Sequence, residues 1–156
     1  MMTEDLTGTV VRIRRAFDAA LLRMGAAKNP ETAEDELSNL LCQIYRLEEL
    51  VKKRKFGSSN KRFHEALRNE DEGTTARAII WARTLDTHYA VVVDKMGDVF
   101  SGSFTEMFGM LVWRPVTDLP EQSSKYGQRD DYATYLAGRA VLDTARLAFD
   151  TLAAMA

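Results

Sequence analysis

Hydrophobic side chains recur every three or four residues along the first third of the chain, which predicts two amphipathic helices. In the first stretch they are Leu6, Val10, Ile13, Phe17, Leu21 and Met24, and the pattern ends near Gly25. The second stretch follows Asn29, a good helix N-cap, and has Pro30 at its first turn. Its hydrophobic positions are Leu37, Leu40, Leu41, Ile44, Leu47 and Val51. This pattern predicts a second helix from about residue 30 to about residue 55.

A basic segment, VKKRKFGSSNKR, follows this helix and breaks at Gly57. Two interpretations are open. Cations are stabilised at a helix C-terminus, and Glu48 with Lys52 and Glu49 with Lys53 have the spacing of helical ion pairs. The segment can also bind phosphate groups. The phosphate-binding candidates are Lys52, Lys53, Arg54, Lys55, Lys61 and Arg62. The next stretch, KRFHEALRNEDEG, predicts a short polar helix in which His64 has no visible partner and no catalytic role.

A third long helix is expected in TTARAIIWARTLDTHYAVVV, from Thr74 or Thr75 to about Val93. Apolar residues lie on both flanks of this helix, which indicates burial against several neighbours, in its own domain or across a subunit interface. Arg83 and His88 would then lie in a mostly dry setting, where polar groups need partners. Asp86 or a phosphate could accept hydrogen bonds from the arginine.

The pattern changes beyond this helix. Residues 97–116 contain three glycines and four aromatic residues without a helix-length run, which predicts a short β-hairpin or an ordered aromatic loop. A last helix is expected from Asp130 or Asp131 to the C-terminus. Its seven-residue repeat comprises Tyr135, Gly138, Leu142, Ala145, Phe149 and Leu152. The small residues permit close approach of another helix, either within the chain or across a dimer.

These elements predict a mainly α fold: an up-and-down bundle of four long or medium helices plus a short one. The hairpin or loop is inserted before the C-terminal helix. The length of 156 residues suits a single domain spanning 1–156, and 46% hydrophobic with 28% charged residues is typical of a soluble globular protein. No apolar run approaches the roughly 20 residues that span a bilayer. The acidic N-terminus, MMTEDLTGTV, does not resemble a signal peptide, so we expect a cytoplasmic protein without membrane contact.

Composition also limits the chemistry. The single cysteine, Cys42, lies among leucines in LSNLLCQIY, which favours a buried structural thiol. No spacing of cysteine and histidine resembles a zinc site, and we expect neither a metal nor a cofactor. A formal net charge of −2 means that any contact with nucleic acid would be local.

The segment RTLDTH, Arg83 to His88, matches the R-x-x-x-x-H motif of HEPN domains. The phrases IIWARTLDTHYA and YATYLAGRAVLDTARLAF also resemble a group of small uncharacterised bacterial proteins. Position 84 is threonine, where the active pattern usually has a longer polar residue. The resemblance implies a compact helical bundle that dimerises and cleaves RNA without a metal, in a toxin or defence context, with a cognate antitoxin or another protein as partner.

The chemistry suits these residue types. RNA supplies its own nucleophile, the 2′-hydroxyl, so cleavage needs a general acid or base, the role of His88, and a cation on the phosphate, the role of Arg83. Thr84, Asp86 and Thr87 would support them. Five helical steps separate Arg83 from His88 by about 140°, so one helix does not direct both at one phosphate, whereas a twofold dimer can combine two copies in one cleft. The alternative is a non-catalytic interaction protein in which Arg83 pairs with Asp86 and His88 is structural.

Overall fold

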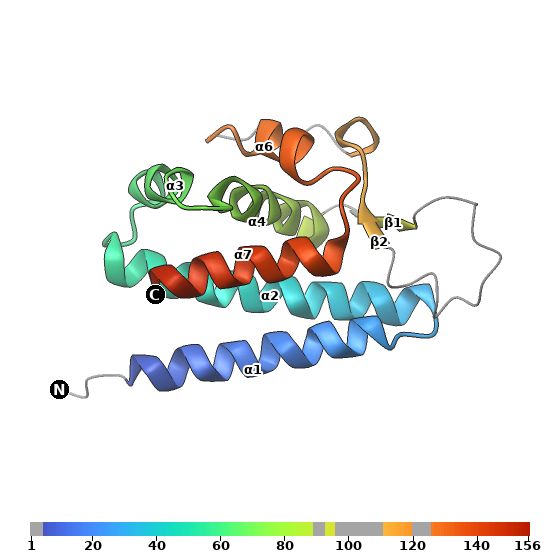
Figure 1. The fold of residues 1–156 in the computed structure, drawn as a ribbon, viewed down its shortest axis with the longest axis horizontal. Helices are drawn as coiled ribbons and strands as arrows, with labels where there is room; N and C mark the ends of the chain where they lie inside the picture. The colour runs from blue at the N-terminus through green and yellow to red at the C-terminus, as the bar shows by residue number, and fades with distance from the viewer. Residues whose placement is uncertain (1–4, 89–92, 96–110, 120–125) are drawn as a thin grey trace.

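The fold is mainly α-helical. The computed structural model describes residues 5–88, 93–95, 111–119 and 126–156, and these contain six α-helices, one 3-10 helix and a two-stranded antiparallel sheet. The elements are α1 (Leu6–Gly25), α2 (Pro30–Lys55), α3 (Asn60–Arg68), α4 (Gly73–His88), β1 (Val93–Lys95), β2 (Leu111–Trp113), η1 (Val116–Asp118), α6 (Gln128–Tyr135) and α7 (Val141–Met155). The predicted helical bundle is therefore confirmed, with the strand pair before the C-terminal helices (Figure 1).

The first two helices begin and end where the hydrophobic pattern places them. The Asp5 carboxylate caps α1 by accepting from the Gly8 N–H, at 3.1 Å. The Asn29 side chain caps α2 by accepting from the Thr32 N–H, at 2.8 Å. These caps satisfy N–H groups that have no partner within the helix. The two helices form a long antiparallel pair (Figure 1).

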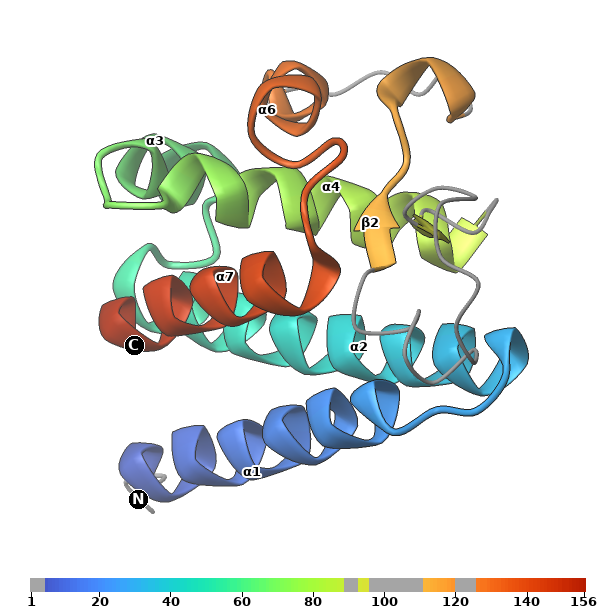
Figure 2. The same ribbon diagram turned by 45° about the vertical axis from the view of Figure 1, so that its right-hand side comes forward.

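Helix α4 lies in the middle of the molecule. It packs against α2 and α7 on one side and against α6 on the other (Figures 1 and 2). Every side chain from Thr75 to Ala82 is buried as a result. The expectation that α4 is covered on several sides is confirmed, and the cover described comes from the same chain. Surplus apolar surface on α4 therefore gives no reason for a second subunit.

The C-terminal region was wrongly predicted as one helix. It consists of α6 and α7, separated at Gly138, whose φ of 76° is incompatible with a right-handed helix. The break is held by β2, because Gly138 N–H donates to the Trp113 carbonyl at 2.8 Å and Trp113 N–H donates to the Arg139 carbonyl at 3.1 Å. These hydrogen bonds replace the helical ones that residues 136–140 give up.

The part of the seven-residue repeat that lies in α7 packs inside the chain, whereas Tyr135 and Gly138 are exposed. Ala145, Phe149 and Leu152 are fully buried, and the Phe149 ring stacks on Phe17 of α1 with centroids 4.2 Å apart. A charge at Ala145 would therefore disrupt this core.

The third long helix is shorter than predicted. Helix α4 ends at His88, and Val93 lies in β1, opposite Trp113 of β2. Val93 suits a strand because β-branched side chains favour extended backbone. Within the expected hairpin or aromatic loop of residues 97–116, positions 97–110 lie outside the described residues.

The buried side chains form one continuous core, to which α1, α2, α3, α4, α6 and α7 all contribute. Cys42 is not part of it: the thiol is exposed, contrary to expectation. The hydrophobic stripe of α2 passes through Leu40, Leu41 and Ile44, and position 42 falls outside it. In the part of the chain that the structure describes, no helix is both long and apolar enough to cross a membrane.

Candidate functional site

The Arg83 side chain is held by an aromatic ring. It is half-buried between α4 and α2, and its guanidinium carbon lies 4.3 Å from the centre of the Tyr45 ring. Such a cation–π contact orients a guanidinium without using its N–H donors. Arg83 Nε is buried and has no hydrogen-bond partner among the described residues. The arginine of the motif is thus positioned by Tyr45, and its buried Nε is left unpaired within the described ranges.

Glu48 is a buried carboxylate whose charge interacts with that of Arg83. Its side chain is only 3% exposed, and one carboxylate oxygen lies 2.7 Å from Lys52 Nζ. The other oxygen is buried without a partner in the described part of the chain. Burial raises the pKa of Glu48, although the charges of Lys52 and Arg83 favour its ionised form. Arg83 therefore acts on Glu48 through its electric field and not through a hydrogen bond.

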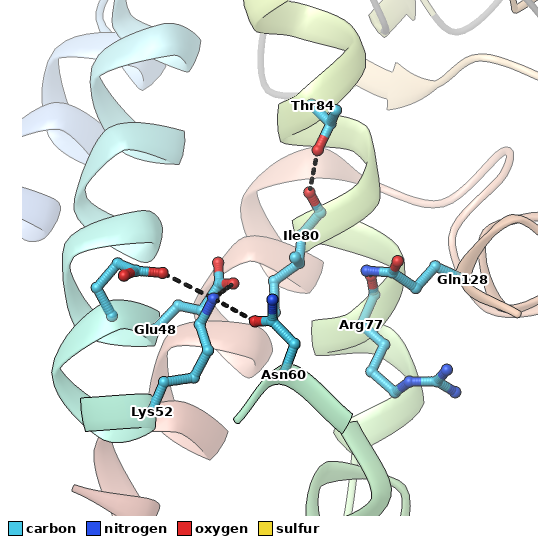
Figure 3. Close-up of polar contacts among 8 residues, drawn as sticks. Glu48, Lys52, Asn60, Arg77, Ile80, Thr84 and Gln128 are labelled. Atoms are coloured by element: carbon cyan, nitrogen blue, oxygen red, sulfur yellow. Dashed lines mark hydrogen bonds and ion pairs between the residues drawn. The ribbon is translucent and has the colours of Figure 1, made fainter. Parts of the chain in front are cut away.

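Lys52 differs from the exposed cations of the basic segment, because it is buried and acceptors of the chain surround its ammonium. Its ammonium contacts Glu48 and Glu49, both at 2.7 Å, and donates to Asn60 Oδ1 at 3.0 Å (Figure 3). An ammonium has three N–H donors, so these three acceptors saturate it. The predicted pair of Glu48 and Lys52 is confirmed, whereas Glu49 pairs with Lys52 and not with Lys53. Lys52 holds α2 to the start of α3.

The remaining supporting residues divide into two groups. The Thr84 hydroxyl donates to the Ile80 carbonyl of its own helix, at 3.3 Å (Figure 3). This bond directs Thr84 along α4. Asp86, Thr87 and His88 belong to α4 by their backbone, but their side chains lie outside the described residues. Their roles stay predictions.

A cavity of about 710 Å³ lies beside Tyr45, between the first half of α1 and the second half of α2. Three cations line it, namely Arg46, Lys53 and Arg54, together with the single carboxylate of Glu49. Tyr45 therefore has Arg83 over its ring and also borders a basic cavity. Two of the predicted phosphate ligands meet here.

The other basic residues lie elsewhere. Lys55 and Arg62 are exposed and border neither this cavity nor a second one, of about 450 Å³, next to α3. Lys61 lines that second cavity with His64, Arg68 and Arg77. The cations of the basic segment therefore line two separate cavities and do not form one continuous patch.

Sequence reasoning missed His64 and Arg77. His64 is 6% exposed and Arg77 is 0% exposed, so neither is a surface residue. A signal was present for His64, because it lies next to Phe63 and three residues before Leu67, on the apolar side of α3. Arg77 stands among buried alanines and isoleucines, which marks it as a cation that needs a partner.

In comparisons with known proteins, no family model, curated protein or solved structure matches the chain.

Proposed function

We propose that the chain is a metal-independent endoribonuclease of HEPN type that acts as a homodimer. Arg83 holds the scissile phosphate and His88 transfers the proton. The observation that carries the proposal is the state of Arg83: its guanidinium is fixed over Tyr45, its Nε has no partner among the described residues, and no carboxylate forms an ion pair with it there. An arginine held in this way keeps donors for an anion.

The basic cavity next to Tyr45 supports RNA as the substrate. The cavity is lined by the cations Arg46, Lys53 and Arg54, although the whole protein has a net negative charge. Their charges attract a phosphodiester backbone whatever its sequence, and the affinity falls as salt rises. An RNA strand that follows these cations comes close to Tyr45 and, over its ring, to Arg83.

The proposed reaction needs only groups of the protein and the RNA. His88 accepts the proton of a 2′-hydroxyl, and the resulting oxygen attacks the adjacent phosphorus. The bond from phosphorus to the 5′-oxygen breaks, and the leaving 5′-oxygen receives the proton that His88 had accepted. Arg83 neutralises the charge that develops on the phosphate oxygens. The products are a 2′,3′-cyclic phosphate and a 5′-hydroxyl end, which balances all atoms without an oxidant or a water molecule.

The dimer follows from the helical geometry of the motif. Arg83 and His88 are five positions apart, hence separated by about 140° around α4. A second copy supplies the missing residue if the two helix ends meet near Arg83. The α4 surface from Thr75 to Ala82 is covered within the chain, so the proposed contact lies at the C-terminal end of α4.

Cleavage of a mixed RNA substrate in the presence of EDTA tests the proposal. We expect cleavage by the wild-type protein and a loss of about a hundredfold or more in His88→Ala, the contribution expected of a general acid or base. Arg83→Gln should lose activity to a similar extent. Arg15→Gln removes an exposed arginine of α1 and serves as the charge-matched control that retains activity. A wild-type protein without cleavage, or a fully active His88→Ala, contradicts the proposal.

One observation favours a second candidate, a non-catalytic interaction protein with a structural motif. The charge of Arg83 acts on the buried Glu48, one oxygen of which has no partner among the residues that the structure describes. In this alternative Arg83 serves only as the countercharge of Glu48. Measurements of stability distinguish the two candidates. If Arg83 is only a countercharge, Arg83→Gln destabilises the fold, and the double variant Arg83→Gln with Glu48→Gln regains the lost stability. That rescue, together with an absence of cleavage by the wild type, would favour the interaction protein.

A further inference from the structure

A second cavity lies away from the motif residues. It has a volume of about 450 Å³ and opens beside α3, next to the start of α4 and the residues that precede α6. Helix α3 contributes Lys61, His64, Glu65 and Arg68, whose spacing of three and four residues places them on one side of the helix. The opposite wall is formed by Arg77, Tyr126 and Gly127. None of these residues takes part in the proposed RNA cleavage.

His64 forms a buried wall of this cavity. Its ring stacks on Tyr126, with centroids 4.5 Å apart and an interplanar angle of 21°. Its Nδ1 is buried and has no hydrogen-bond partner among the described residues. Burial, together with the charges of Arg77, Lys52 and Arg68, lowers the pKa of His64 to about 4. The imidazole is therefore neutral at pH 7 and has one donor and one acceptor nitrogen.

Two guanidinium groups converge beside His64. Arg77 donates to the Tyr126 carbonyl and forms an ion pair with Asp131 at 2.5 Å, while its Nε is buried without a partner in the described part of the chain. Arg68 donates to the same Tyr126 carbonyl, at 3.1 Å. Like charges that share one carbonyl repel each other. Burial is the main cause that lowers the pKa of Arg77, and the charge of Arg68 adds to it against the opposing effect of Asp131.

The cavity carries more positive than negative charge. Lys61, Arg68 and Arg77 face the single lining carboxylate of Glu65, and Asp131 neutralises part of the charge of Arg77 from outside the lining. Lys61 and Arg68 are exposed, and no ion pair involves either of them within the described ranges. An anion between α3 and Tyr126 would relieve the repulsion and supply acceptors for free N–H groups.

We propose that this cavity binds a phosphate monoester through Arg68, Lys61 and His64. A terminal phosphate is close to dianionic at neutral pH and has three acceptor oxygens. It therefore suits a neutral imidazole and two cations that form no ion pair among the described residues better than a singly charged diester does. The volume lies within the range of small-ligand sites, so it also accommodates part of the group that carries the phosphate. The monoester belongs to a free mononucleotide or to the phosphorylated end of an RNA.

Isothermal titration of the full chain in phosphate-free buffer distinguishes these sources. The ligands are adenosine 5′-monophosphate, adenosine, and a short RNA with and without a 5′-phosphate. Binding of the mononucleotide but not of adenosine assigns the site to a free ligand. Binding of only the 5′-phosphorylated RNA assigns it to an RNA end. Either result supports the proposal, whereas equal affinity for the phosphorylated and unphosphorylated member of both pairs, or no binding, overturns it.

Two variants locate the binding. Arg68→Gln should weaken the binding of the monoester by about tenfold to a hundredfold, as expected when a hydrogen bond to a charged group is lost. The matched control is Arg15→Gln, an exposed arginine of α1 outside the lining. His64→Phe keeps a ring on Tyr126 and removes both nitrogens, so it should fold and bind more weakly. Unchanged affinity in both Arg68→Gln and His64→Phe would refute the site, even if RNA cleavage is observed.

Discussion

The buried imidazole of His64 makes stability depend on pH, and His64→Phe should remove that dependence. His64 packs between Phe63, with ring centroids 5.2 Å apart, and Tyr126, at 4.5 Å. Phenylalanine preserves the ring and both aromatic contacts. It removes the buried Nδ1, which has no hydrogen-bond partner among the described residues, and it removes a titrating group. The substitution therefore separates packing from polarity.

The magnitude follows from linkage between protonation and folding. The pKa of His64 is about 4 in the folded state, against 6.5 for an unperturbed histidine. Below pH 6.5 the unfolded chain binds a proton that the folded chain excludes, so wild-type stability falls until about pH 4. A pKa shift of this size corresponds to a loss of about 3 kcal/mol in the free energy of unfolding. Solvent in the adjoining cavity screens the charge and reduces this loss to about 2 kcal/mol. At pH 7 the imidazole is neutral in the folded and the unfolded chain. Only the burial of its unpartnered nitrogen then lowers stability, by about 1 kcal/mol.

Urea unfolding followed by circular dichroism, at pH 7, 6, 5 and 4.5 in phosphate-free buffer, measures both effects. His64→Phe should be more stable than wild type by about 1 kcal/mol at pH 7, or about 2 to 4 °C in melting temperature. Its advantage should grow to about 3 kcal/mol near pH 4.5. His64→Gln is the matched control, because it removes the titration but keeps a polar side chain. Parallel pH profiles of wild type and His64→Phe would show that His64 does not titrate with folding.

Two further substitutions test the core. Lys52→Met leaves the buried Glu48 carboxylate without its ammonium partner, so it should lower the free energy of unfolding by about 3 kcal/mol in urea at pH 7. The loss should be smaller at acid pH, where Glu48 is protonated. The control is Lys53→Met, which changes an exposed lysine and should alter stability by less than about 0.5 kcal/mol. Ala145→Glu places a charge in a fully buried position and should unfold the chain, whereas Leu147→Glu, at a position 42% exposed, should stay folded. A folded Ala145→Glu, or a Lys52→Met as stable as wild type, would contradict the packing described.

The sequence predicts the first two helices well because their ends are local events. Asn29 caps α2 through a neighbouring N–H, and the hydrophobic stripe up to Val51 has the helical period. Both signals act within a few residues, so no knowledge of the rest of the fold is needed.

The break in the C-terminal region depends on partners that lie far away in the sequence. Trp113 exchanges hydrogen bonds with the segment around Gly138, and the indole of Trp113 donates to Thr144 Oγ1 at 2.8 Å. Gly138 is the only local signal, and a glycine alone does not distinguish a helix break from a close helix contact. The seven-residue repeat was therefore misread as one continuous helix.

The candidate site shows the same limit for side chains. Lys52 and Lys53 are adjacent lysines at one helix end, and only the packing of α2 on α3 turns the first inward and the second outward. The pairing of Arg83 with Tyr45 likewise follows from the contact between α2 and α4. Residue types predict which chemistry is available, whereas tertiary contacts decide which residues are free to perform it.

An active site composed of residues from two copies can be recognised by mixing two inactive variants. Arg83→Gln and His88→Ala are each expected to lack RNA cleavage. Coexpression yields mixed dimers that combine an intact Arg83 from one copy with an intact His88 from the other. We predict that the mixed sample cleaves RNA in EDTA, while each variant alone does not. A mixed sample as inactive as its two parents, beside an active wild type, would contradict a site shared between two copies.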